Sequence, residues 1–298
     1  MSGDMLLGAL SAAGALQLPE LARALQVDVG VDVSVTERGA LQAVAVAVRA
    51  ADDQPHRRLA DVQRIIEDAD LVTPVKARAI AVFVRLAEAE ARVHGREPSD
   101  VEFHEVGAVD AIVDIVGVCA GLHALGLDEL VVSPIALGGG QMQTAHGTLP
   151  IPGPAVLELL RGCGLAAYGG PVDHELATPT GIALLAEWAS RSGPMPPMTI
   201  TGSGVGAGSR DLPQHPNVLR LVVGERLAEP DADEWQVMAA NIDDLDPRLW
   251  PGVIDRLLAA GAVDAWLTPI LMKKGRPAHT VHVMCAASKA DGVRRALF

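Results

Sequence analysis

The segment from His104 to Asp114 (HEVGAVDAIVD) carries the side chains best suited to chemistry, because it sets four polar groups at the start of an otherwise apolar helix. Asp110 and Asp114 are four residues apart, so a helix places both carboxylates on one face, one turn from each other. The residues that follow, 115–127, are largely apolar, and they should carry Asp114 into a low-dielectric interior. A carboxylate there needs a cation, a donor or a proton, because an unpaired buried charge is strongly destabilising.

Residues 101–103 are typical of a short strand that delivers His104 and Glu105 to the same end of this helix. Imidazole combined with several carboxylates suits a divalent metal ion or acid–base catalysis. A plain helix start is the alternative, with Asp110 near the positive end of the helix dipole and His104 hydrogen-bonded in a turn.

Two further segments could hold an anion. A strand-like run leads into the glycine triplet at 138–140, whose backbone amides would be free to donate. Thr178 and Pro179 are typical of the N-cap and first residue of a helix that continues over 182–191, and such a helix start favours a phosphate or carboxylate. An ordinary turn and plain helix capping would also explain these residues.

A third segment alternates glycine with other residues from Gly202 to Gly208. It departs from the G-x-G-x-x-G pattern and precedes prolines rather than a helix, which argues against a Rossmann dinucleotide site. We expect the three loops to share, with His104, His146 and His174, one pocket for an anionic ligand near a metal.

The elements that position these residues alternate in type, which predicts a mixed α/β N-terminal domain. Helices are predicted at 3–16, 18–25 and 59–93, over the stretch that contains Asp110 and Asp114 and continues through 115–127, and from Pro154 and Pro179. Strands are predicted at 27–48 around a turn at Arg38-Gly39, at 101–103, 130–137 and 217–223. The polar stretch 224–234 (GERLAEPDADE) is a predicted linker. It divides an acidic metal- and substrate-binding domain at 1–223 from a smaller domain at 235–298.

The second domain has the predicted order βαββα, with strands at 235–242, 264–272 and 280–286 and helices at 247–260 and from Ser288. This order is a ferredoxin-like unit without its last strand. The polar and charged residues that could bind a ligand lie at one edge of this domain. The acidic residues follow the first strand, and the basic residues follow the second. These are Asn241, Asp243, Asp244 and Asp246, and Lys273, Lys274 and Arg276.

Acid beside base at this edge indicates a nucleotide with Mg²⁺, because carboxylates hold the ion while Lys and Arg bind phosphate oxygens. The alternative is a hairpin turn rich in solvated bases beside an aspartate-rich helix cap. An unpaired strand in this domain also predicts self-association through it, or a partner that supplies the missing strand.

Composition excludes several classes. A net charge of −13 and an aromatic content of 3% argue against nucleic-acid binding. Three cysteines in apolar settings, none in a C-x-x-C pair, argue against a disulfide framework or a zinc site. No uncharged apolar run has membrane-spanning length and no secretory leader is visible, so we expect a cytoplasmic protein with no membrane partner.

Charge divides unevenly between the two predicted domains. Residues 235–298 carry eight Lys or Arg and six Asp or Glu, a balance of +2, which leaves −15 for residues 1–234. We therefore expect the two parts to bind different ligands.

Seven short blocks occur in a fixed order along nearly the whole chain. They are MSGDM from Met1, the segment from His104 to Gly117, GGG from Gly138 with His146-Gly147, ELATPTG from Glu175, GVGAG from Gly204, NIDD from Asn241 and MKKGRP from Met272. In these blocks the chain resembles the LarC family, which inserts nickel into pyridinium-3,5-bisthiocarboxylic acid mononucleotide to form the nickel-pincer cofactor of lactate racemase and related enzymes.

The resemblance implies a nickel chelatase, or cyclometallase, of the lyase class that depends on CTP with Mg²⁺ or Mn²⁺. It assigns nickel or its delivery to His104, Glu105, Asp110, Asp114 and His146, with Glu105 or His104 as the base that removes the ring proton. It assigns the substrate phosphate to Gly138, Gly139, Gly140, Thr178, Thr180 and Gly181. It assigns the nucleotide to Asn241, Asp243, Asp244, Lys273, Lys274 and Arg276.

The chain departs from the family pattern at three places. In the family, a first strand leads into the block that begins here at Met1, and this strand is not in the sequence. Many members also carry a histidine-rich tract, and the corresponding place here holds only DDQPH at 52–56. The family also continues past Phe298, so we expect an incomplete CTP site, a homo-oligomer formed through the second domain, or a separate C-terminal chain as partner.

Two other functions use the same residues. A metal-dependent phosphoester hydrolase would activate water with the His and Asp cluster, and turnover of phosphoesters without CTP would identify it. A non-catalytic metal- or nucleotide-binding module would bind ligands and form no product.

Overall fold

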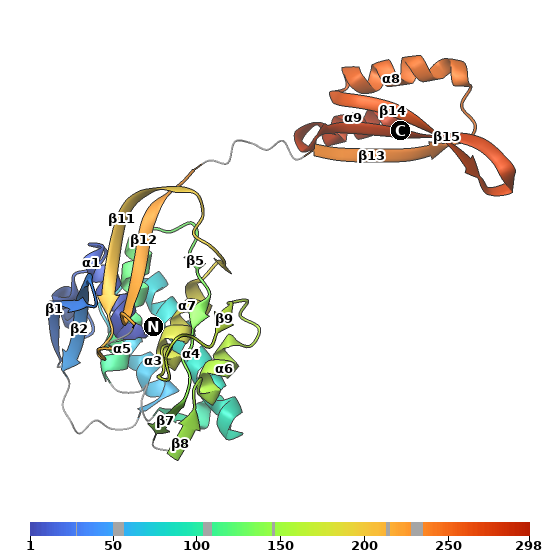
Figure 1. The fold of residues 1–298 in the computed structure, drawn as a ribbon. Helices are drawn as coiled ribbons and strands as arrows, with labels where there is room; N and C mark the ends of the chain where they lie inside the picture. The colour runs from blue at the N-terminus through green and yellow to red at the C-terminus, as the bar shows by residue number, and fades with distance from the viewer. Residues whose placement is uncertain (28, 50–56, 104–108, 145–146, 213–214, 228–234) are drawn as a thin grey trace. The chain divides into compact units, whose positions relative to one another are not determined.

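The computed structural model describes residues 1–27, 29–49, 57–103, 109–144, 147–212, 215–227 and 235–298. The chain divides into two compact units, Met1–Arg226 and Leu227–Phe298 (Figure 1). Each unit has its own hydrophobic core. Helices and strands are mixed in both units, which confirms the predicted fold class. No helix among the described residues is long and apolar enough to cross a membrane.

The first unit contains seven of the described helices. They are α1 (Gly3–Ala12), α2 (Leu18–Ala24), α3 (Leu59–Asp68), α4 (Thr73–His94), α5 (Val109–Ala124), α6 (Pro154–Leu160) and α7 (Pro179–Trp188), with a short 3₁₀ turn at Pro98–Asp100. Where one helix was expected over 59–93, the structure has α3 and α4 separated at residues 69–72. Pro74 explains the break, because its ring cannot sit in a helix interior but is tolerated in the first turn of α4.

A four-stranded sheet supports these helices. Its order is β1 (Gly30–Arg38), β2 (Leu41–Arg49), β11 (Met198–Ala207) and β12 (Val218–Arg226), with β2 and β11 parallel and the other neighbours antiparallel. β12 continues through Arg226, so the first three residues of the expected linker lie in a strand.

The remaining strands of this unit form short pairs. They are β3 (Arg57–Arg58) with β4 (Glu102–Phe103), β5 (Val131–Val132) with β10 (Arg191–Ser192), β6 (Ile135–Ala136) with β9 (Ala167–Tyr168), and β7 (Gln141–Thr144) with β8 (Gly147–Pro150). The single strand expected over 130–137 is therefore two short strands, β5 and β6, which pair with different partners.

The glycine alternation after residue 202 forms strand β11, and the expectation of an anion-binding loop there was wrong. Helix α1 lies directly on β11: a Cβ at Gly204 would come 1.9 Å from the Ala9 carbonyl oxygen, and one at Gly206 would come 1.8 Å from the Met5 carbonyl oxygen. Every second residue of a strand faces the same side. The alternating glycines therefore leave room for a helix backbone.

The second unit has the predicted βαββα order. It comprises β13 (Trp235–Ile242), a 3₁₀ turn (Pro247–Leu249), α8 (Trp250–Ala259), β14 (Ala262–Met272), a turn at Lys273–Gly275, β15 (Arg276–Ala286), a 3₁₀ turn (Ala287–Lys289) and α9 (Ala290–Leu297). The strands form an antiparallel sheet in the order β13-β15-β14, the order of the first three strands of a ferredoxin-like unit (Figure 1). Both helices contribute to one core against this sheet, through Trp250, Leu257 and Val293.

Candidate functional site

Three helices of the first unit, α1, α5 and α7, run in the same direction. A Cβ at Gly117 of α5 would contact Leu7 of α1, and a Cβ at Gly121, one turn later, would contact Leu10 of α1. The two helices are therefore parallel. The start of α7 lies against the start of α1, where a Cβ at Gly181 would come 2.8 Å from the Met1 carbonyl oxygen. The N-terminal ends of these helices, which carry partial positive charge, therefore lie at the same end of the unit.

Carboxylates gather at this end. Burial raises the pKa of Asp114 well above its usual range, and the nearby charges of Asp4 and then Asp110 raise it further, while a hydrogen bond from the Asp4 backbone N–H acts in the opposite direction. Gly3 permits this contact, because a Cβ there would come 2.6 Å from Asp114 Oδ2. The predicted shared face of Asp110 and Asp114 on α5 is observed. Asp114 as a whole is half-buried, and its carboxyl group is the buried part.

Asp4 is the functional candidate that reasoning from the sequence left without a role. Its carboxylate accepts a hydrogen bond from the Ser2 hydroxyl, and its charge acts on Asp114 from a different helix. The signal was present, because Asp4 lies in the first of the seven family blocks. Only the tertiary structure pairs it with Asp114, 110 positions later in the chain. Asp110, in contrast, is exposed, and its Oδ1 accepts from the adjacent Ala111 N–H at 2.8 Å.

The start of α7 has the predicted capping geometry. Thr178 is the N-cap residue, and its side chain accepts a hydrogen bond from the Gly181 N–H at 3.3 Å, with Pro179 as the first helical residue. The Thr178 N–H donates to the Met1 carbonyl at 3.0 Å. These contacts attach the α7 start to the segment that carries Asp4, so two of the seven blocks meet the α5 block at this end of the unit.

The glycine triplet lies beside the segment that precedes α7. Gly138 forms an isolated bridge with Glu175, and a Cβ at Gly138 would come 1.7 Å from the His174 carbonyl oxygen. The Gly138 N–H donates to the Gly169 carbonyl. Close backbone packing therefore explains Gly138 without a ligand, and the role of the triplet in phosphate binding stays a prediction.

Three expected site residues, His104, Glu105 and His146, lie outside the described residues. Their neighbours are placed: β4 ends at Phe103, α5 begins at Val109, and β7 and β8 flank residues 145–146. Within the described part of the chain, no group of three His, Cys, Asp or Glu residues is arranged to hold a metal ion. The expected nickel site therefore depends on side chains that the described ranges do not include.

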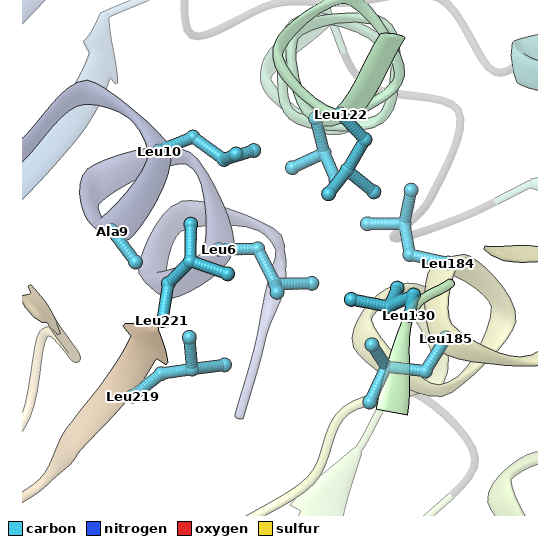
Figure 2. A pocket seen from close by; sticks show the side chains of 10 residues that line it. Leu6, Ala9, Leu10, Leu122, Leu130, Leu184, Leu185, Leu219 and Leu221 are labelled. Atoms are coloured by element: carbon cyan, nitrogen blue, oxygen red, sulfur yellow. The ribbon is translucent and has the colours of Figure 1, made fainter. Parts of the chain in front are cut away.

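A small pocket below this end of the unit is not a site for polar chemistry. Figure 2 shows Leu6 and Leu10 of α1, Leu122 of α5 and Leu184 of α7 facing one another, and all ten lining residues are Leu, Val or Ala. Such a lining offers no donor, acceptor or charge, so we regard the pocket as a gap in the packing between the three helices.

The cysteines offer no competing metal site. Cys119 is buried on α5 with its sulfur 3.4 Å from the Trp188 indole nitrogen, and burial raises the pKa of its thiol to about 12. A thiol held protonated at neutral pH is a poor nucleophile and a poor metal ligand. All three cysteines are free; Cys119 and Cys285 are buried and Cys163 is half-buried.

The second unit brings most of the expected nucleotide residues to one end of its sheet. The Arg276 guanidinium lies 3.4 Å from Asp243 Oδ2, and the Thr280 hydroxyl donates to Asn241 Oδ1 at 2.6 Å. Lys273 and Lys274 occupy the tight turn between β14 and β15, where Lys274 has a φ of +64°. All of these side chains except Thr280 are exposed, as is Asp244.

Asp246 has a local structural role. Its carboxylate accepts from the Arg248 backbone N–H at 3.0 Å and from the Arg248 guanidinium at 2.6 Å, and these bonds lower the pKa of Asp246. It thus caps the 3₁₀ turn that precedes α8. The other polar residues at the end of β13 are Asn241 and Asp243, which have the partners given above, and Asp244.

The whole chain, residues 1–298, matches the family model described as nickel insertion protein. A protein of Nocardioides sp. (strain ATCC BAA-499 / JS614), named pyridinium-3,5-bisthiocarboxylic acid mononucleotide nickel insertion protein, is 51% identical over 304 residues that cover 100% of this chain and 75% of the relative. A protein of Desulfitobacterium hafniense (strain DSM 10664 / DCB-2) with the same name is 40% identical, with 100% and 76% covered. Among solved structures, apo LarC2, the C-terminal domain of a cyclometallase involved in synthesis of the NPN cofactor of lactate racemase, is 35% identical over 21% of this chain and 44% of that chain, with a TM-score of 0.21.

Proposed function

Because the chain belongs to the nickel insertion protein family, we propose that it is the enzyme that inserts nickel into pyridinium-3,5-bisthiocarboxylic acid mononucleotide, and that the reaction depends on CTP. The observation that carries this proposal is the meeting of three family blocks around the buried carboxyl group of Asp114. Nickel is the cargo of this reaction, so its site must hold the ion and then release it.

Imidazole and carboxylate ligands meet both demands. They bind Ni²⁺ through nitrogen and oxygen, and a soft sulfur ligand on the substrate can replace them. We assign this role to His104, Glu105, Asp110, Asp114 and His146, and the contact with Asp114 adds Asp4. Formation of a nickel–carbon bond also requires loss of a proton from the ring, for which Glu105 or His104 is the candidate base.

The substrate phosphate is assigned to the common end of the three parallel helices. Helix starts offer backbone N–H groups and partial positive charge to an anion. Thr178, Thr180 and Gly181 lie at the start of α7, and the loop of Gly138, Gly139 and Gly140 lies beside the preceding segment. A phosphate here would add to the repulsion among the neighbouring carboxylates, and a bound cation would relieve that repulsion, so we expect nickel and substrate to bind cooperatively.

CTP with Mg²⁺ or Mn²⁺ is assigned to the second unit. Lys273, Lys274 and Arg276 would bind phosphate oxygens, and Asp243 and Asp244 would hold the ion, with Asn241 beside them. The geometry that supports this assignment is the 3.4 Å pair of Arg276 and Asp243, which joins the acidic and basic groups at one edge.

The test is formation of the nickel-containing product from purified protein, Ni²⁺, CTP, Mg²⁺ and the pyridinium mononucleotide, followed by mass spectrometry. The parent protein should form product only when CTP is present. A double variant, His104→Ala with Asp114→Asn, should bind Ni²⁺ at least about tenfold more weakly by calorimetry, or about 1.4 kcal/mol, and lose product.

The matched control removes an imidazole and a carboxylate near the other end of α5. His123 and Asp128 are both exposed, so His123→Ala with Asp128→Asn should bind nickel as the parent does. Product formed without CTP would refute the nucleotide requirement. Parent-like nickel affinity in the folded His104 and Asp114 variant would place the metal site elsewhere.

A further inference from the structure

Strand β1 forms one edge of the four-stranded sheet in the first unit (Figure 1). It pairs with β2 along its whole length, from Gly30 opposite Arg49 to Arg38 opposite Leu41, without a bulge. Among the described strands, none pairs with its other edge. Natural edge strands are commonly blocked against further pairing by lysine, proline or a bulge. The sequence of β1, GVDVSVTER, has none of these, so its outer edge is suited to pairing with another strand.

The apolar face of β1 is exposed. Residues directly opposite each other share a face of a sheet, so Val33 and Val35 lie on the same face as Val46 and Val44 of β2. Helix α1 lies on this face over β2, where a Cβ at Gly8 would come 2.4 Å from the Val44 carbonyl oxygen. Burial falls toward the edge: Val46 is 7% exposed, whereas Val33 opposite it is 47% exposed and Val35 is 66% exposed. A further strand at this edge would cover part of both valines.

The opposite face of β1 carries polar side chains, namely Asp32, Ser34, Thr36 and Arg38. Asp32 Oδ1 accepts from the Arg49 guanidinium at 2.6 Å, across the pair of strands. The Arg38 guanidinium donates to Thr36 Oγ1 and to the Gly208 carbonyl, each at 3.0 Å. These contacts hold a negative group near the start of the strand and a positive group at its end.

This arrangement of charge is self-complementary. When two copies of β1 pair antiparallel around a two-fold axis, one residue lies opposite itself. With Val35 in that position, Asp32 lies opposite Arg38 of the second copy, and the same pair recurs at the other end. Ser34 then lies opposite Thr36 of the second copy. A register centred on Ser34 would instead place Asp32 opposite Thr36, without a charge partner.

We propose that β1 pairs with β1 of a second copy of this chain, antiparallel and centred on Val35, so that the two four-stranded sheets become one continuous sheet. Backbone hydrogen bonds and burial of the valines supply the affinity. The charge pairs fix the register, because exposed ion pairs contribute more to specificity than to energy. The contact is isologous and closes at two copies, whereas pairing of β1 with β12 of another copy would extend without closing.

The experiment measures self-association of the full chain by sedimentation equilibrium at roughly 1–100 µM, which brackets the micromolar affinity expected of a contact smaller than a standard interface. Val35→Lys should weaken association at least about tenfold, because two lysines would lie opposite each other. Val35→Glu should do the same for the same reason. An equimolar mixture of the two variants should associate again, since opposite charges then meet at the axis.

Ile200→Lys is the matched control. Ile200 is an exposed β-branched residue on β11 of the same sheet, so this variant should associate as the parent does. Association through the second unit would survive all of these substitutions, since they lie in the first unit. The change at Val35, compared with that at Ile200, therefore measures the β1 contact.

Cysteine substitution tests the register. Val35→Cys should be joined into dimers by a short bismaleimide, because the Cβ atoms of directly opposite residues lie about 4.5–5.5 Å apart. Val33→Cys would lie opposite Glu37 of the second copy and should stay uncrosslinked. The parent, whose own cysteines are buried or half-buried, sets the background.

Several outcomes would overturn the inference. One is a parent that stays monomeric over this concentration range, and another is a folded Val35→Lys variant that associates as the parent does. A mixture of Val35→Lys and Val35→Glu that fails to associate would also overturn it, because Val35 would then not face itself. So would cross-linking at Val33 rather than at Val35.

Discussion

The carboxyl group of Asp114 lies in surroundings that disfavour its charge. Burial is the largest cause of its raised pKa, followed by the charges of Asp4 and Asp110. A group whose pKa is higher in the folded than in the unfolded protein reduces stability as the pH rises above the unfolded value. Asp114 therefore destabilises the metal-free protein at neutral pH, and a bound cation would relieve this penalty.

Replacing Asp114 with Asn should stabilise the metal-free protein at neutral pH. The gain is about 1.4 kcal/mol for each unit by which folding raises the pKa. It should vanish near pH 4, close to the unfolded pKa of roughly 3.9, grow as the pH rises from there to the folded pKa, and stay constant above it. Urea unfolding of parent and variant between pH 4 and 8 measures it.

The Asp110→Asn variant is the control for this measurement, since Asp110 is exposed and contributes less to the shift than Asp4. Its stability should differ from that of the parent by a smaller amount over the same range. A stability difference for Asp114→Asn that does not change with pH would contradict the role given to burial.

At the scale of single residues, the sequence was informative where the pattern was local. A spacing of four placed Asp110 and Asp114 on one helix face. The apolar residues that follow predicted a buried carboxyl group at Asp114, which is half-buried as a whole residue. The neighbour with the larger effect, Asp4, is distant in sequence and is brought close only by the packing of α1 on α5. No spacing rule predicts a contact of that kind.

At the scale of elements, the largest error concerned β11. Alternating glycines were interpreted as a loop because glycine exposes backbone amides, but a period of two is also that of a strand. The glycines form the surface on which α1 lies, with carbonyl oxygens of α1 where their side chains would be. Local chemistry alone could not distinguish these alternatives, because the partner of the strand face is a helix from the other end of the unit.

Gly206→Ala should therefore destabilise the protein by about 1–3 kcal/mol or more, the usual range for overpacking a filled interior. Its Cβ would come 1.8 Å from the Met5 carbonyl oxygen, so α1 would have to move off the sheet. Because α1 carries Asp4, nickel affinity should fall as well. Chemical unfolding and calorimetry on one preparation test both effects.

Gly202→Ala provides the matched control on the same strand. A Cβ there would meet only the Val223 side chain at 3.9 Å, an ordinary contact distance. This variant should be within about 0.5 kcal/mol of the parent. Equal destabilisation by the two substitutions would mean that strand propensity, rather than contact with α1, explains the glycines.

At the scale of the whole molecule, the chain separates two kinds of chemistry. Residues 1–234 have a balance of −15 and contain the buried carboxylate, whereas residues 235–298 have a balance of +2 and contain the exposed basic turn. Composition thus predicted a division that agrees with the two compact units, although the first unit continues to Arg226. We propose that the first unit holds nickel and the pyridinium substrate and that the second holds CTP.

Replacing Lys273, Lys274 and Arg276 together with Ala tests this division. Three cations that face one triphosphate are difficult to replace, so CTP binding should be lost. Nickel affinity should stay within about threefold of the parent value, or ~0.6 kcal/mol. A second triple variant, with Ala at Lys289, Arg294 and Arg295 near and on α9, removes the same charge from the same unit and should keep CTP binding. A different outcome would contradict this division: nickel affinity could be lost together with CTP binding in the folded first variant. Nickel and CTP would then share one site, because a loss of both affinities from one set of substitutions requires that the two ligands contact the same residues or are strongly coupled.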